Sequence, residues 1–265
     1  MRNVNAVFYK QFKDTLKNPA TLIQFIIYPL IAFVITRFID FENMMNLENM
    51  FEGMTEEAQA IVQAVALEMQ SAAQANMPNM TTMQATIFAG MGLIFIVAGI
   101  ISADAETKSL RFLMMAGVKP ASYLLGVGGV VFFISIVTSV AFTLIGGFRG
   151  RDFWIFLASM MSGVTASIVL GAIFGILMKN QQAASGLAMP AAIILGFGPM
   201  MAQFNDNIAR VFHIFYTQHI NVVANYLTTG SAETSLWESF GIMWANIAVL
   251  GVLFALAYTR KGLAE

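Results

Sequence analysis

The sequence predicts an all-α, polytopic membrane protein with six transmembrane helices, and its composition and hydropathy both support that fold class. Hydrophobic residues make up 58% of the 265 residues and charged residues 11%, compared with about 25% charged in an average globular domain. The mean hydropathy is +0.71. A chain this apolar is solvated by a bilayer, and we expect residues 1–265 to form a single membrane domain.

Six apolar runs are long enough to cross a membrane, because about 20 residues, at roughly 1.5 Å of rise each, span a hydrocarbon core of about 30 Å. The runs are residues 21–39, 84–103, 121–148, 153–178, 183–204 and 239–259. The first run follows Asn18-Pro19, a capping residue and a proline that together signal a helix start. Four spans, with pairs of runs fused or buried, are the less favoured alternative.

Features inside and between the runs predict how the helices connect and pack. The segment GGFRGRDF separates the third run from the fourth and predicts a hairpin. Pro190 and Pro199 predict a break or kink in the fifth run. Gly171 and Gly175, in GAIFG, have the spacing that permits close helix packing.

The distribution of Lys and Arg predicts the orientation, because basic residues gather on the cytoplasmic side of membrane proteins. With the N-terminus in the cytoplasm, ten of the 14 fall inside: Arg2, Lys10, Lys13, Lys17, Lys108, Arg111, Lys119, Lys179, Arg260 and Lys261. Four fall outside: Arg37, Arg149, Arg151 and Arg210. We expect a multi-pass protein of a bacterial inner (plasma) membrane, with cytoplasmic termini and external segments at residues 40–83 and 205–236.

Residues 1–17 predict an amphipathic helix that lies in the cytoplasmic interface and forms an elbow before the first span. Its apolar side chains recur every four residues: Val4, Phe8, Phe12 and Leu16. Lys10, Lys13 and Asp14 face elsewhere. A passive anchor and a specific gating role are both consistent with this pattern.

Residues 103–119 interrupt the apolar runs with charge. On a helix, Leu110, Leu113, Met114 and Gly117 follow one face, while Glu106, Lys108, Ser109 and Arg111 lie around it. A short helix of this kind inserts its apolar side into a groove of another protein. The periodicity fits a solvated loop equally well.

The first external segment carries a predicted helix over residues 55–76 and a methionine-rich stretch. Met77, Met80 and Met83 are spaced three residues apart, and thioethers suit Cu(I). A copper-handling membrane protein is therefore an alternative function. Against it, methionine commonly fills adaptable apolar surfaces.

The sequence lacks the residues that several kinds of chemistry require. The Lys108-Ser109 pair has neither glycine of a P-loop, so the chain has no ATP site of that type. No H-E-x-x-H or G-x-S-x-G occurs, there is no cysteine, and His213 and His219, six residues apart, fall on different faces of any one helix. A net charge of -1 argues against nucleic acid as a partner. The middles of the predicted spans contain no Asp, Glu, Lys, Arg or His, so any uphill transport would have to draw its energy from outside the chain.

Three stretches carry a family resemblance. They are KNPATLIQFIIYPLIAFVI, with Asn18-Pro19 and Tyr28-Pro29; Glu106-Thr107-Lys108-Ser109-Leu110-Arg111-Phe112-Leu113; and Ala116-Gly117-Val118 followed by Tyr123-Leu124-Leu125-Gly126. With them, the whole chain resembles an ABC-2-type transporter permease, the membrane subunit of ATP-binding-cassette exporters. In that family a Gly-Thr-Leu pattern commonly follows the acidic residue, and here Lys108 replaces the glycine.

The resemblance implies a coupling helix that docks on a separate P-loop ATPase, which would carry ATP and Mg²⁺. The implied coupling residues are Glu106, Lys108, Ser109, Leu110, Arg111, Phe112 and Leu113. It also implies a second permease chain, identical or related, and short external helices before the last span. We expect no catalytic residue, cofactor or metal on this chain. The expected cargo is apolar or amphiphilic: a drug, a hydrophobic peptide or a lipid. A nucleotide-independent channel or scaffold is the other alternative.

Overall fold

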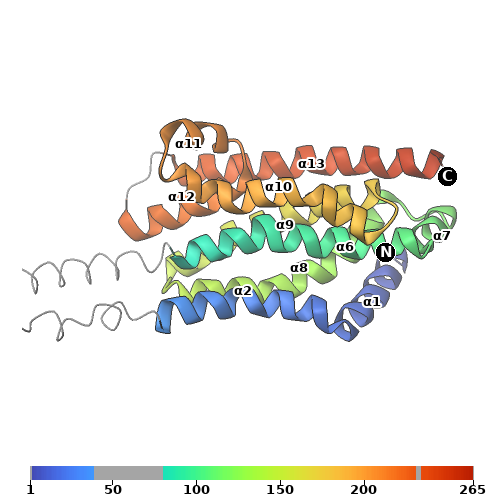
Figure 1. The fold of residues 1–265 in the computed structure, drawn as a ribbon, viewed down its shortest axis with the longest axis horizontal. Helices are drawn as coiled ribbons and strands as arrows, with labels where there is room; N and C mark the ends of the chain where they lie inside the picture. The colour runs from blue at the N-terminus through green and yellow to red at the C-terminus, as the bar shows by residue number, and fades with distance from the viewer. Residues whose placement is uncertain (1, 39–79, 231–233, 265) are drawn as a thin grey trace, which may run out of the picture.

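The computed structural model describes residues 2–38, 80–230 and 234–264, and the regular structure within these ranges is helical (Figure 1). The elements are α1 (Arg2–Lys17), α2 (Pro19–Phe38), the π-helix η1 (Phe88–Gly92), α6 (Leu93–Glu106), α7 (Ser109–Met115), α8 (Pro120–Ile145), α9 (Arg151–Leu177), α10 (Gln181–Ala202), α11 (Asp206–Phe212), α12 (Tyr216–Thr229) and α13 (Leu236–Ala264). Six helices in these ranges are long and apolar enough to cross a membrane, which confirms the predicted fold class.

The helix starts follow the predicted signals. The Asn18 side-chain oxygen accepts a hydrogen bond from the Ala20 backbone N–H at 3.1 Å, and α2 begins at Pro19. Pro120 is the first residue of α8, where its missing N–H has no helical partner to lose. The turn between α8 and α9 contains Gly147 and Gly150, both with positive φ, which glycine adopts readily. The predicted hairpin is therefore present.

Two predictions inside the spans have different outcomes. α10 runs through Pro190 and Pro199 as one helix, so the chain does not break there. Gly171 and Gly175 do allow close packing of α9 on α6. A Cβ at Gly171 would lie 2.8 Å from the backbone oxygen of Ile94, and one at Gly175 would lie 2.9 Å from that of Ala98. Only a residue without a side chain fits at either position.

The span over residues 80–106 contains the π-helical turn η1. A π-turn holds one residue more than an α-turn and releases backbone groups from the regular hydrogen-bond ladder. The Ser167 hydroxyl of α9 donates to the Ala89 carbonyl within this turn and also contacts the Tyr216 hydroxyl of α12 at 2.9 Å. The irregular turn is thus bonded to α9, and through Ser167 it is linked to α12.

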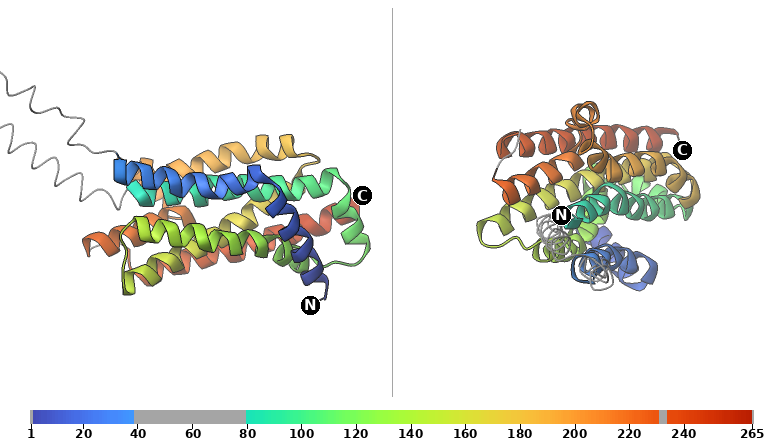
Figure 2. Two further views of the ribbon diagram at one scale, coloured as in Figure 1. Left: turned by 90° about the horizontal axis from the view of Figure 1, so that it is seen from below. Right: turned by 60° about the vertical axis from the view of Figure 1, so that its left-hand side comes forward.

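The elbow helix α1 turns away from α2 and crosses α8 (Figure 2). Its buried residues are Val7, Gln11 and Thr15. The predicted apolar stripe is displaced from this buried face by one position in the sequence. Val4, Phe8 and Phe12 are half-buried, and Leu16 is 50% exposed. The close approach needs Gly126 of α8, because a Cβ there would lie 2.5 Å from Val7 Cγ1.

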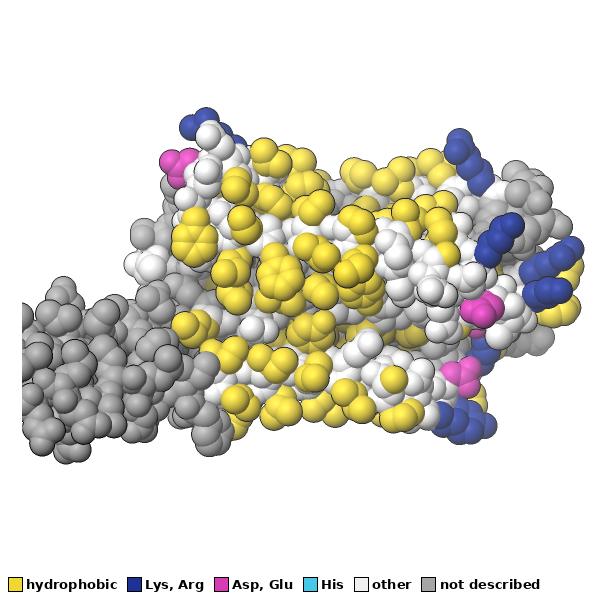
Figure 3. All heavy atoms as spheres, in the orientation of Figure 1, with side chains coloured by type: hydrophobic (Ala, Val, Ile, Leu, Met, Phe, Trp, Pro, Cys, Tyr) yellow, Lys and Arg dark blue, Asp and Glu magenta, His cyan; other side chains and the backbone are white. Residues whose placement is uncertain are grey.

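The two ends of the bundle carry different elements. α1, the C-terminal end of α13 and α7 share one end, and α11 and α12 lie at the other (Figure 1). Lys and Arg side chains cluster at the α7 end in the face shown in Figure 3. The predicted external helix of residues 55–76 and Met77 lie outside the described residues. Met80 and Met83 belong to the helix at the start of the second span.

Candidate coupling site and adjoining cavity

The short helix α7 projects beyond the ends of α6 and α8 (Figure 1). Leu110 is 2% exposed and belongs to the hydrophobic core, and Leu113 packs against that core. Phe112 and Met115 are each 65% exposed, and Arg111 is also exposed. The helix is therefore anchored by one side and presents a large apolar surface on the other.

The turns at both ends of α7 need the left-handed region of the backbone. Lys108, before α7, has φ 59° and is the only non-glycine residue with positive φ in the described chain. This is the position at which the related pattern has glycine. After α7, Gly117 has φ 73° and Val118 N–H donates to Leu113 C=O at 3.1 Å, the bond of a Schellman cap. Lys108 keeps the backbone conformation that glycine would favour.

The root of α7 is tied to three other helices through Asp104. Lys10 Nζ of α1 lies 2.7 Å from Asp104 Oδ1, and the Tyr123 hydroxyl of α8 donates to Asp104 Oδ2 at 3.0 Å. The Tyr123 ring lies 5.8 Å from that of Tyr258 in α13, whose hydroxyl donates to Val118 C=O at 3.0 Å. We call these four side chains, Lys10, Asp104, Tyr123 and Tyr258, the Asp104 node.

Glu106 links the root of α7 to α10. Its Oε2 accepts a hydrogen bond of 3.4 Å from the Gln181 backbone N–H, in the first turn of α10. Asn180 caps the same helix, with its side-chain oxygen 2.8 Å from the Ala183 N–H. A carboxylate is favourable there, because a helix N-terminus carries partial positive charge. The acid therefore faces the loop between α9 and α10.

The predicted coupling residues thus divide into three groups. Leu110 and Leu113 face the protein, Glu106 faces α10, and Lys108, Arg111 and Phe112 are exposed with Ser109 half-buried beside them. The sequence reasoning passed over Asp104 as a site residue. Its signal is an acid in the last turn of an apolar span, where an ionisable group needs a partner.

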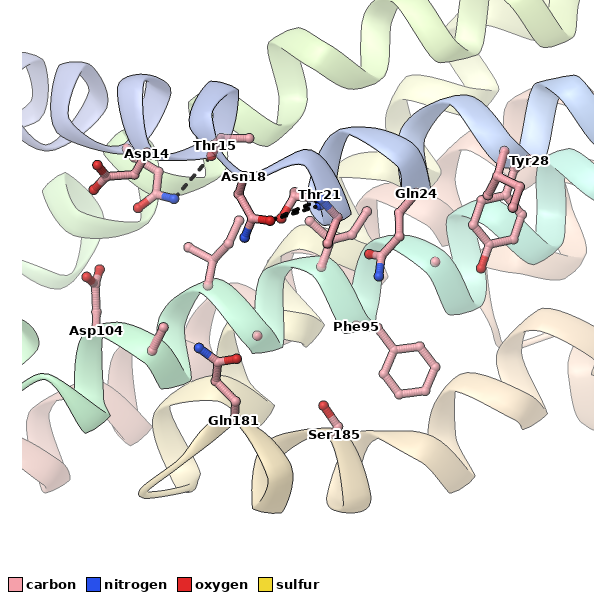
Figure 4. A pocket seen from close by; sticks show the side chains of 18 residues that line it. Asp14, Thr15, Asn18, Thr21, Gln24, Tyr28, Phe95, Asp104, Gln181 and Ser185 are labelled. Carbon is pink, nitrogen blue, oxygen red and sulfur yellow. Dashed lines mark hydrogen bonds between the residues drawn. The ribbon is translucent and has the colours of Figure 1, made fainter.

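A cavity of about 550 Å³ adjoins the node between α1, α2, α6 and α10 (Figure 4). Asp14 and Asp104 lie toward its α7 end, and polar side chains follow along its walls: Thr15, Asn18, Thr21, Gln24, Gln181 and Ser185. Phe95 and Tyr28 lie further along, toward the middle of the spans. Within the part of the chain that the structure describes, none of the residues that line this cavity is Lys or Arg.

The two histidines meet at the opposite end of the bundle, although they would fall on different faces of any one helix. His213 is the C-cap that follows α11 and His219 lies in α12, and their rings are 5.1 Å apart. His219 Nε2 is 2.7 Å from the His213 carbonyl oxygen. Within the part of the chain that the structure describes, no group of three or more His, Cys, Asp and Glu could hold a metal.

Six candidate spans, an elbow helix and an anchored knob between the second and third spans describe a polytopic membrane protein. The sequence profile described as ABC-2 family transporter protein matches residues 3–256, and the chain therefore belongs to that family. Its members are transport subunits without catalytic activity of their own and work with ABC ATPase subunits. Among curated proteins, no sequence matches the chain.

Proposed function

We propose that the chain is the permease subunit of an ATP-driven exporter, with its α7 end in the cytoplasm and α7 docked on a separate ABC ATPase. The observation that carries this proposal is the exposed surface of Phe112 and Met115 on a helix whose other side is buried. Exposed aromatic residues on a rigid support are typical anchors for a partner's pocket. The cluster of Lys and Arg at the same end supports its cytoplasmic location.

The anchoring of α7 supports a mechanical role for this contact. Glu106 and the Asp104 node connect the root of α7 to α1, α8, α10 and α13. A displacement of α7 by the ATPase would therefore move several spans together. ATP and Mg²⁺ would remain on the partner, and no step of hydrolysis would involve this chain.

The proposed cargo is apolar or amphiphilic, such as a drug, a hydrophobic peptide or a lipid. The centres of the described spans carry no charged side chain, so a strongly charged solute would have no partner along them. The apolar outer faces of α2 and α13, which are largely unburied, would contact lipid and a second permease chain, identical or related.

The test uses the full chain, purified from its native membrane with any bound ATPase. We expect a P-loop ATPase to copurify, and we expect Phe112→Ala with Met115→Ala to weaken its binding about tenfold or more, the loss of a typical interface anchor. Trp154→Ala is the matched control, because Trp154 is 68% exposed at the far end of α9. Full transport in vesicles that contain no ATPase would contradict the proposal and favour a nucleotide-independent channel.

A further inference from the structure

We propose that the cavity between α1, α2, α6 and α10 binds an amphiphile with a cationic head group, its head at the α7 end and its tail toward Phe95. The inference deepens the proposed export function, on which its biological meaning rests. The binding itself depends on the permease chain alone.

The cavity changes in polarity along its length in the way an amphiphile does. Asp14 and Asp104 lie at the α7 end, amides and hydroxyls follow, and Tyr28 and Phe95 lie at the far end (Figure 4). A head group at the first end would find acceptors, and a hydrocarbon tail would contact apolar side chains. The volume of about 550 Å³ lies within the range of about 300–1,000 Å³ typical of small-molecule sites.

The charges at the polar end select the sign of the head group. Both oxygens of Asp104 already have partners, Lys10 and Tyr123. Asp14 also lines the cavity, and among the residues that the structure describes no Lys or Arg lines it to neutralise Asp14. The lining is therefore net negative, so a cation is attracted and an anion is repelled.

The space for a ligand comes from small residues on one face of α6. Gly99 and Ala103 both line the cavity. A Cβ built on Gly99 meets no atom within 4 Å, so this helix leaves open space there that a side chain would otherwise fill. A larger residue at position 99 would occupy the cavity without displacing a neighbour's backbone.

The experiment measures equilibrium binding of two radiolabelled probes to the full chain in phosphatidylglycerol nanodiscs. The probes are dodecyltrimethylammonium and dodecyl sulfate, which share a tail and differ in the sign of the head. We expect saturable binding of the cation, about tenfold tighter than that of the anion. Asp14→Asn should weaken cation binding about fivefold, as expected for one partly screened charge pair.

Gly99→Leu should abolish saturable binding, whereas Gly251→Leu should leave it unchanged, because a Cβ at either glycine has nothing within 4 Å but Gly251 does not line the cavity. Thermal unfolding of both variants shows that each still folds. Adding phosphatidylethanolamine to the discs separates two sources of the ammonium head. Weaker probe binding identifies the bilayer lipid as a competing ligand of the same site, and unchanged binding identifies a single-chain cation from elsewhere.

Equal affinity for the two probes would overturn the proposal, as would cation binding that survives Gly99→Leu. Neither result bears on the ATPase contact, because no ATPase is present. Conversely, cation binding in a chain that recruits no ATPase would contradict the proposed function and leave the site intact.

Discussion

Lys10 Nζ lies 2.7 Å from Asp104 Oδ1 although the two residues are 94 positions apart in the chain. The pair joins the elbow helix to the last turn of the second span, directly before the exposed knob. Its side chains are 45% and 10% exposed, so the aspartate is largely withdrawn from water and depends on its partners.

The first prediction concerns this pair. Asp104→Asn should lower the stability of the fold by about 1–3 kcal/mol, because Lys10 and the Tyr123 hydroxyl both lose the charged carboxylate that they contact. A thermal-unfolding cycle with Lys10→Met should give a coupling energy of at least about 0.5 kcal/mol. Lys13→Met, at an exposed position of the same helix, is the control. Strictly additive effects of Lys10→Met and Asp104→Asn would show that the contact contributes nothing.

The second prediction concerns the turn before α7. Lys108→Gly should stabilise the permease by about 1 kcal/mol, because a lysine with φ 59° carries a steric cost that glycine does not. The melting midpoint should rise by about 2–4 °C for a chain of this size. Gly117→Ala, with φ 73° at the other end of α7, should have the opposite effect. A lower midpoint for Lys108→Gly would mean that the lysine side chain stabilises the turn.

The third prediction concerns the hydroxyl contact between Tyr216 and Ser167. Tyr216 is buried, and removing its hydroxyl in Tyr216→Phe should cost about 1–2 kcal/mol, because Ser167 then loses a partner inside the protein. Thermal unfolding measures the loss. Tyr226→Phe is the control, since Tyr226 lies on the same helix and is exposed. Equal effects at the two tyrosines would remove the support for a special contact at Tyr216.

The fourth prediction concerns the packing of α9 on α6. Gly175→Val should destabilise the protein by about 1–3 kcal/mol or more, because the new side chain would meet the Ala98 backbone oxygen. Backbone cannot move aside as a flexible side chain can. Gly251→Val introduces the same side chain into a helix with open space around it. The relevant quantity is the difference between the two melting midpoints, and a difference near zero contradicts the prediction.

The fifth prediction concerns pH. Burial lowers the pKa of His219 below its ordinary value of 6.5. The hydrogen bond to the His213 carbonyl and the negative charge of Glu238 raise this pKa, and the charge of His213 lowers it, but burial is the largest effect. Below pH 6.5 the unfolded chain therefore binds more protons at this residue than the folded chain does. Stability should be full above that pH and should fall as the pH drops below it.

The measurement is the melting midpoint between pH 7.5 and 5. His219→Gln should flatten the acid slope. His213→Gln should preserve the hydrogen bond that His219 makes to the residue 213 carbonyl, since that bond uses the backbone. An acid slope in His219→Gln equal to that of the unchanged protein would assign the effect to other groups.

The spans and their starts could be predicted because hydropathy and capping are local properties of the chain. Asn18, Pro19 and Pro120 act within one helical turn, so their effect follows from the residues beside them. The spacing of Gly171 and Gly175 also gave a correct expectation of close packing, although the partner helix could not be named.

The contacts of the site could not be predicted, because they join residues that are distant in sequence. The buried face of α1 includes Gln11 and Thr15, whose side chains bond to each other at 3.2 Å, so apolar periodicity indicated the neighbouring stripe. His213 lies in the turn after α11 and His219 in α12, and a helical wheel cannot place them together. The cavity likewise exists only where four helices meet.

The π-helical turn at Phe88–Gly92 has a consequence for how many residues the second span can hold. A π-turn absorbs one additional residue locally, so the chain beyond it keeps its facing. Loss of one residue within this turn would restore a regular helix and leave Asp104 opposite Lys10. Loss of one residue between this turn and Asp104 has no such buffer and would swing Asp104 about 100° around the axis, away from the amine it meets. The π-turn can therefore absorb a change in length that the regular helix leading to Asp104 cannot.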